Sequence, residues 1–210
     1  RTASAAVVIA TIVLLGEATT QRNQVFQSWY TYWSDTVTKA PSWRSHNNMG
    51  WHHLNNGDLK QAQEHFEAAM EFKNANPIVL TNLAEVADKQ GRSLDAKQWH
   101  DQAVVANKYT SIALEHRAAH LLNHGHFEAA LHDLKRAKPM TTRHHWVHIQ
   151  AAQALASLGD WNEASREFLE ARTIDSMKTE ASIQQVAAPY WISDSQARAG
   201  ILFFEALEAQ

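Results

Sequence analysis

The chain has 210 residues, of which 45% are hydrophobic and 20% are charged, and its formal net charge at pH 7 is −3. This composition is ordinary for a folded soluble domain, and the weak negative charge provides no basic field to hold a nucleic-acid backbone. The sequence contains no cysteine, which excludes disulfides, thiolate metal ligands and cysteine nucleophiles but leaves the redox compartment undecided. We therefore expect no nucleic-acid partner.

The N-terminal segment is apolar, and residues 3–16 contain no charged side chain. This run of 14 residues is shorter than the roughly 20 that a membrane-spanning helix needs. We predict that residues 1–20 form a hydrophobic helix that is the end of a transmembrane helix. The alternatives are an uncleaved, signal-like anchor and a buried helix of a soluble domain. Because the chain starts at Arg1 rather than at methionine, we expect it to be processed or part of a longer chain.

The next segment, residues 21–40, is rich in aromatic side chains. These are Phe26, Trp29, Tyr30, Tyr32 and Trp33. Tryptophan and tyrosine are enriched at membrane–water interfaces, so we predict a Trp-rich, membrane-proximal helix. An N-terminal packing helix would use the same residues and is the alternative.

From residue 43 onward the sequence repeats itself. Gly57, Gly91, Gly125 and Gly159 are each 34 residues apart (91 − 57 = 34). The same step connects two columns of alanines and one column of larger residues between them. These columns are Ala62, Ala96, Ala130 and Ala164; Ala69, Ala103, Ala137 and Ala171; and Phe66, His100, Leu134 and Phe168. A fixed period in several columns indicates a stacked repeat architecture.

Each unit is predicted to be a helical hairpin. In the first unit we expect one helix from about Trp43 to Asn56 and a second from about Leu59 to Lys73. The glycine between them suits the left-handed position that follows a helix end. The predicted repeats cover residues 43–76, 77–110, 111–144 and 145–178, within a repeat region from 43 to about 176. Residues 179–210 are predicted to form a degenerate repeat and a capping helix, because a terminal repeat must cover an exposed apolar face.

The spacing of these residues resembles the tetratricopeptide repeat (TPR), a helix–turn–helix unit of about 34 residues. The resemblance implies an all-α superhelical solenoid of about four repeats whose first helices line a concave groove. Onto this sequence it places the second, fifth, ninth and twelfth residues of each first helix in that groove. They are Arg44, Asn47, Trp51 and Leu54; Ile78, Thr81, Glu85 and Asp88; Ile112, Glu115, Ala119 and Leu122; and Trp146, Ile149, Gln153 and Ala156.

This mixed wall, apolar with a few polar groups, suits an extended or helical peptide segment. It does not match the carboxylate-clamp type of TPR, because Ile112 and His116 occupy positions where cations would be needed. We therefore predict a protein or peptide partner. The alternative is a groove that is only hydrated surface or is filled by the chain's own terminal helix.

Residues 19–50 show a second resemblance, to the junction between the membrane region and the TPR tail of bacterial GT-C-like membrane proteins, including transmembrane O-mannosyltransferases. The matching residues are Arg22, Asn23, Trp29, Trp33, Asp35 and Pro41. The resemblance implies that a catalytic membrane region precedes this chain and that the repeats lie outside the cytoplasm.

The 13 histidines invite a metal hypothesis. His116, His120 and His124 share one stripe of a predicted helix, with His126 just beyond it, and His144 and His148 form another i, i+4 pair. Two histidines on adjacent turns can chelate Zn²⁺ or Cu²⁺, but a closed site needs further ligands, and none is visible nearby in the sequence. In the TPR register these histidines fall away from the concave wall. We predict solvated surface histidines and no metal site, with a metal site or a pH-responsive contact as the alternatives.

We predict no catalysis within these residues. The sequence has no GxSxG, HExxH or GxGxxG motif, and its acidic residues are scattered along predicted helices as on a solvated face. We accordingly expect no cofactor and no small-molecule substrate.

The predicted function is that of a membrane-tethered TPR scaffold, periplasmic in location, that binds a protein partner through its concave face. It could be the non-catalytic tail of a glycosyltransferase-like membrane protein. The alternative is a stand-alone anchored adaptor that helps to assemble a membrane or envelope complex.

Overall fold

The computed structural model describes residues 2–72, 76–106, 111–142 and 144–175. These residues form ten α-helices and one 3-10 helix, and they contain no strand. In chain order the elements are α1 (Thr2–Gln24), α2 (Trp29–Lys39), α3 (Trp43–Asn55), α4 (Leu59–Phe72), α5 (Pro77–Lys89), α6 (Ser93–Ala106), α7 (Ser111–Asn123), α8 (Phe127–Ala137), η1 (Lys138–Met140), α9 (His144–Ser157) and α10 (Trp161–Ile174).

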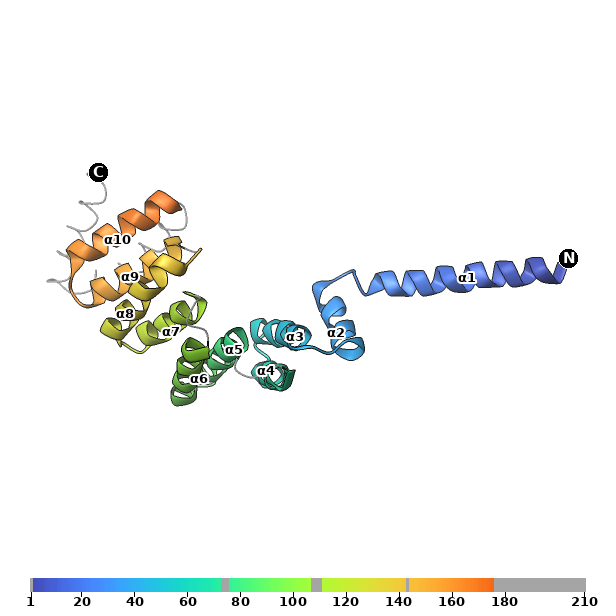
Figure 1. Cartoon of the computed structure of the whole chain (residues 1–210), viewed down its shortest axis with the longest axis horizontal. Coiled ribbons are helices and arrows are strands. Elements are labelled where there is room, and N and C mark those ends of the chain that lie inside the picture. The colour runs from blue at the N-terminus through green and yellow to red at the C-terminus, as the bar shows by residue number, and fades with distance from the viewer. Residues whose placement is uncertain (1, 73–75, 107–110, 143, 176–210) are drawn as a thin grey trace.

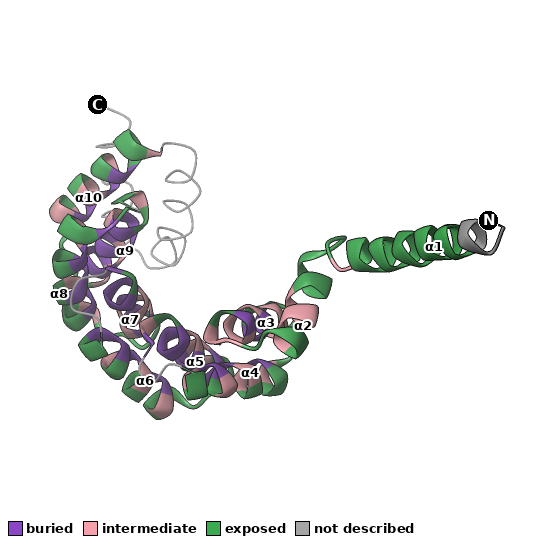
Figure 2. Ribbon diagram, turned by 45° about the vertical axis from the view of Figure 1, so that its right-hand side comes forward, coloured by how far each residue is buried: buried purple, intermediate pink, exposed green. Residues whose placement is uncertain are grey.

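The helices from α3 to α10 pair as four consecutive hairpins, α3 with α4, α5 with α6, α7 with α8 and α9 with α10. The hairpins stack into a curved row, and α1 projects away from it as a long separate helix (Figure 1). The first helices α3, α5 and α7 lie on the inner side of the curve and their partners α4, α6 and α8 on the outer side (Figure 2). The prediction of an all-α solenoid of helical hairpins is therefore confirmed for these residues.

Every hairpin closes through the same backbone turn. Gly57, Gly91, Gly125 and Gly159 all have positive φ angles, between 74° and 82°, as predicted for the left-handed position. In the first turn the Gly57 amide donates to the Leu54 carbonyl and the Asp58 amide donates to the His53 carbonyl. This pair of bonds is a Schellman motif, which satisfies carbonyls left unpaired at the end of a helix. The other three turns repeat both bonds, so one local device sets the geometry of all four hairpins.

The core between the helices follows the repeating columns. The alanines at both column positions are fully buried in every repeat, which allows close helix packing. Phe66 and Phe168 are buried beside them. Gly50 faces Phe66 so closely that a Cβ at residue 50 would lie 2.6 Å from the ring. The first repeat thus accommodates its phenylalanine by omitting a side chain on the facing helix.

Among the described residues, no element covers the apolar half of the N-terminal helix α1, and Val7, Val8 and Ile9 are each exposed by 56–65%. Among the described residues, no helix is both long enough and apolar enough to cross a membrane. The predicted hydrophobic helix is present as the first part of α1, and Glu17 and Arg22 interrupt the apolar sequence in its second part. That residues 1–20 are the end of a transmembrane helix stays a prediction.

The junction between α1 and α2 is held by charge. Asp35 of α2 lies 2.5 Å from Arg22 of α1 and 2.5 Å from Lys39 of its own helix. Ser28 begins α2 with a capping box that it shares with Thr31. The predicted degenerate repeat and capping helix at 179–210 lie outside the described residues.

Candidate functional site

The inner side of the curve is the candidate binding face, and the predicted groove residues divide there into two groups. One group is accessible. It consists of the exposed Arg44, Trp51, Ile78, Ile112 and Trp146 and the partly exposed Asn47, Glu85, Asp88, Ala119 and Gln153. This accessible group defines what we call the inner face.

The second group is buried and cannot contact a partner in this structure. Its members are Leu54, Thr81, Glu115, Leu122, Ile149 and Ala156. Leu54 packs with Phe66 in the core between repeats, and Ile149 packs with Phe168. Glu115 instead accepts a hydrogen bond of 2.7 Å from the Thr141 hydroxyl. We therefore correct the predicted groove by removing these six residues, because they stabilise the stack itself.

The accessible group includes a regular line of apolar side chains. Ile78, Ile112 and Trp146 are the second residues of the repeats to which α5, α7 and α9 belong, and they recur every 34 residues (112 − 78 = 34). Each is exposed by about two fifths, at 42%, 41% and 43%. Arg44 occupies the equivalent position in α3. The stacking of the repeats therefore presents apolar groups at regular steps along the inner side of the curve.

Trp51 lies at the N-terminal end of this face and is partly shared with α2. Its ring packs edge-on against Trp29, with 5.7 Å between the ring centroids. The Trp29 ring also lies 5.8 Å from His52. The aromatic residues of α2 thus pack onto α3, as expected for a packing helix, while Trp51 remains 50% exposed.

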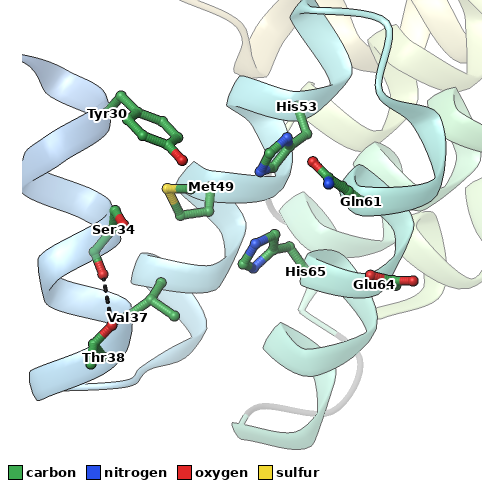
Figure 3. A pocket seen from close by; sticks show the side chains of 9 residues that line it. All are labelled: Tyr30, Ser34, Val37, Thr38, Met49, His53, Gln61, Glu64 and His65. Atoms are coloured by element: carbon green, nitrogen blue, oxygen red, sulfur yellow. Dashed lines mark hydrogen bonds between the residues drawn. The ribbon is translucent and has the colours of Figure 1, made fainter.

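A cavity of about 340 Å³ lies where α2, α3 and α4 meet. Figure 3 shows Tyr30 and Ser34 on α2 facing His53 on α3 and His65 on α4 across it. His65 also contacts His46, with 3.2 Å between the two Nδ1 atoms. Burial lowers the pKa of both His46 and His65, so both rings are neutral near pH 7 and one can donate to the other.

A second histidine cluster joins the second and third repeats. The His120 ring nitrogen Nδ1 lies 2.8 Å and 3.0 Å from the two carboxylate oxygens of Asp88. The His120 ring lies 4.3 Å from that of His124 and 5.1 Å from that of His100, measured between centroids. Among the described residues, Asp88, His120 and His124 can each offer one metal-ligand atom within 4.8 Å of the other two.

This cluster corrects the prediction of solvated histidines. His124 is exposed, but His120 is 5% exposed and His100 is 3% exposed. His100 occupies the column position that holds Phe66 in the first repeat, so its ring is packed into the core. Burial, followed by the nearby His120, lowers the pKa of His100 to about 3. The sequence signal that could have found the cluster is the presence of His100 in a column whose other members, Phe66, Leu134 and Phe168, are apolar.

A second cavity of about 370 Å³ lies between α6, α7 and α8, and His120 lines part of it. Arg117 of α7 lines this cavity and joins α8 to α6. Its guanidinium donates two hydrogen bonds to Asp133, of 2.7 Å and 2.8 Å, and one of 2.8 Å to Asp101. The hydrogen bonds to Asp133 are the main cause that raises the pKa of Arg117, so its charge is permanent.

Comparison with known proteins places the fold. No protein-family model matches the chain, and no curated protein matches it. Its structure is similar to that of PilF from Pseudomonas aeruginosa, with 13% sequence identity, a TM-score of 0.65, and coverage of 78% of this chain and 73% of PilF. It is also similar to YrrB, a TPR protein with an unusual peptide-binding site, at 14% identity and TM-score 0.60, over 82% of this chain and 89% of YrrB.

A third similar structure is MamA from Desulfovibrio magneticus RS-1, at 14% identity and TM-score 0.60, over 80% of this chain and 96% of that one. At this level of identity the similarity defines the fold alone. The chain therefore has the fold of a solenoid of the tetratricopeptide-repeat type.

Proposed function

We propose that the chain is a protein-interaction scaffold that binds an extended or helical peptide segment along its inner face. The observation that carries the proposal is the line of Ile78, Ile112 and Trp146, which stay exposed on helices whose other apolar residues are mostly buried. Regularly spaced apolar anchors on a concave surface suit a partner whose own side chains repeat at a fixed distance. The peptide-binding site described for YrrB supports a peptide partner for this fold.

Exposure alone does not single out these residues, and this provides the control. Leu94 and Val105 of α6 are exposed by 76% and 73%, more than any residue of the line. They lie on α6, which is on the outer side of the curve (Figure 2). The equivalent positions of the neighbouring repeats, 34 residues away, hold no exposed apolar side chain of this kind. If partners bound to any exposed apolar residue, they would also bind at Leu94 and Val105. If they bind only along the inner face, they would not contact these two residues.

The test is site-specific photo-crosslinking in cells that express the chain. A crosslinker at residue 78, 112 or 146 is expected to capture the same partner, and one at residue 94 or 105 is not. The triple variant Ile78→Ser, Ile112→Ser, Trp146→Ala should then lose the partner, while Leu94→Ser with Val105→Ser retains it. Equal capture from α6, or a triple variant that still binds, would contradict the proposal.

We also propose that the apolar half of α1 attaches this scaffold to a membrane. Val7, Val8, Ile9, Val13 and Leu14 are all exposed. Since successive residues of an α-helix are about 100° apart, these side chains together surround the helix instead of forming one apolar face. A helix that is apolar on all sides favours burial on all sides, as in a bilayer or within a membrane protein. The Arg22–Asp35 contact joins two residues of the junction that resembles GT-C-like membrane proteins.

Under this proposal the chain is the tail of a glycosyltransferase-like membrane protein, with a stand-alone anchored adaptor as the alternative. The repeats would lie outside the cytoplasm. Flotation with liposomes tests attachment: the chain should float, and a chain lacking residues 1–16 should not. Protease accessibility in intact spheroplasts tests the side of the membrane, and protection of the repeats from external protease would contradict a periplasmic location.

A further inference from the structure

The cluster of Asp88, His120 and His124 lies where two inner helices end. Asp88 is in the last turn of α5, His120 is in the last turn of α7, and His124 follows directly after α7. Helix C-termini carry partial negative charge and favour a cation in the last turn. Asp88 is partly exposed and His124 is exposed, so the cluster is open to solvent on one side.

The hydrogen bonds of His124 fix which ring nitrogen is available. His124 Nδ1 lies 2.9 Å from the backbone carbonyl oxygen of His120. A carbonyl can only accept, so Nδ1 carries the proton and donates it. Neutral imidazole has a single N–H, which leaves a lone pair on His124 Nε2. Metal-ligating histidines commonly donate their other N–H to a backbone carbonyl in this way.

The other two ligand atoms of the cluster, from His120 and Asp88, already lie side by side. His120 Nδ1 and the nearer Asp88 oxygen are 2.8 Å apart, joined by one proton. In a tetrahedral zinc site with bonds of about 2.0–2.1 Å, neighbouring ligand atoms lie roughly 3.3 Å apart. A small outward shift would admit a cation between them, with the His120 proton moving from Nδ1 to Nε2. No net proton is lost, because the proton stays on the His120 ring.

We propose that Asp88, His120 and His124 bind one divalent cation of the Zn²⁺ type, bridging the second and third repeats. Two imidazole nitrogens and one carboxylate oxygen form a ligand set that suits Zn²⁺. Three protein ligands leave a further position for water or for a group of a bound partner. The site is independent of the proposed partner binding, because the chain alone supplies all three ligands.

Two groups near the site, His100 and Arg117, do not compete for the Asp88 carboxylate. His100 Nε2 lies 4.0 Å from the Asp88 carboxylate, beyond hydrogen-bond distance, and its buried ring is neutral. Arg117 lies near enough to influence His100, but its guanidinium is engaged by Asp101 and Asp133. The Asp88 carboxylate therefore has His120 as its hydrogen-bond partner and remains free to bind a cation.

The experiment is calorimetric titration of the full chain with Zn²⁺, after chelator treatment. We expect one tight equivalent per chain. His124→Ala removes an exposed ligand, and Asp88→Asn keeps the shape and a hydrogen-bond acceptor for His120. Each should weaken zinc binding by at least about 10- to 100-fold, which is the loss typical of removing a group that only supports a ligand.

Circular dichroism shows whether each variant keeps its helix content, and thermal denaturation gives a second readout. Zinc should raise the melting temperature of the unchanged chain, since a ligand that binds only the folded state stabilises it. At the same zinc concentration it should raise the melting temperature of the two variants less. His144→Ala is the matched control, because His144 is exposed and belongs to the other i, i+4 pair. Absence of tight binding, binding that survives both cluster variants, or binding lost in His144→Ala would each overturn the proposal.

Discussion

His100 shows how one residue changes a repeat. Its column position is taken by Phe66 and Phe168 in the first and fourth repeats, where the ring fills the space between helices. His100 fills the same kind of space, but its Nδ1 atom has no hydrogen-bond partner among the described residues. A buried polar atom without a partner costs about 1–3 kcal/mol. The second repeat is therefore less stable than its shape alone implies.

We predict that His100→Phe raises the free energy of unfolding by about 1 kcal/mol, because it removes that unpartnered atom. The fit is supported by the fourth repeat, where Phe168 packs in one cluster with Ala152, the counterpart of Ala84. Urea denaturation at pH 7 measures the change. A variant that is less stable than the original would show that the histidine makes compensating contacts through its ring.

The same substitution changes the response to acid. Burial lowers the pKa of His100 to about 3 in the folded chain, whereas an unfolded histidine has a pKa of about 6.5. The unfolded state thus binds a proton first, and the contribution of the neutral side chain to stability is lost as the pH falls from about 6.5 towards 3. His100→Phe should flatten the decline of stability across this window. An unchanged slope in denaturation curves between pH 7 and pH 4 would contradict the prediction.

At the scale of the helices, side chains from different repeats tie neighbouring elements together. Arg117 of α7 joins Asp101 of α6 to Asp133 of α8, and Asp133 is 1% exposed. Lys138 of η1 and His148 of α9 both contact Glu167 of α10. Such contacts fix the orientation of one hairpin on the next, which apolar packing alone would leave less specific.

We predict that Arg117→Met lowers the free energy of unfolding by about 3 kcal/mol, since it leaves the buried Asp133 charge without its main partner. Arg136 and His132, each 3.7 Å from Asp133, would offset only part of the loss. The double variant Arg117→Met, Asp133→Leu should recover much of the stability, because it removes both charges. Denaturation of the three proteins gives the coupling, and a double variant no more stable than Arg117→Met would count against a buried charge pair.

The sequence predicts the helices well, but it predicts the residues of the binding face less well. The glycine and alanine columns act within one hairpin, so their period reveals the hairpin directly. Thr141 and Glu115 are 26 residues apart, and Asp88 and His120 are 32 apart. The contact of Asp88 with His120 depends on how one repeat is rotated against the next. The contact of Glu115 with Thr141 depends on how the segment after α8 returns to α7. No local sequence pattern specifies either arrangement. For this reason the sequence suggested a groove position for Glu115 and a solvated one for His120, and both side chains are buried.

At the scale of the whole molecule, the structure is a chain of neighbours. Each inner helix contacts the next inner helix, as α5 does α7 and α7 does α9, and each hairpin packs on the hairpin beside it. In such an array stability is roughly the sum of repeat and interface contributions, so damage to one repeat is felt mainly by its neighbours. We therefore expect the parts of the stack to open separately.

We predict that Phe168→Ala, in the fourth repeat, loosens α9 and α10 while α3 and α4 stay protected. Removal of a buried phenylalanine costs about 3–5 kcal/mol, and Phe168 is 1% exposed in a cluster with Ile149 and Leu155. Hydrogen–deuterium exchange should show faster exchange from residue 144 onward and unchanged exchange in residues 43–72. Faster exchange along the whole stack would mean that the solenoid unfolds as one unit.

Because the turns at Gly57 and Gly91 are identical, one whole repeat could be removed between them without changing the turn that remains. A chain lacking residues 58–91 would join Gly57 directly to Arg92 and keep the same hinge. It would be one repeat shorter, and the apolar contacts between its remaining repeats would keep their spacing. Related proteins that gain or lose whole repeats could therefore bind longer or shorter partners without any change in the sequence of a turn.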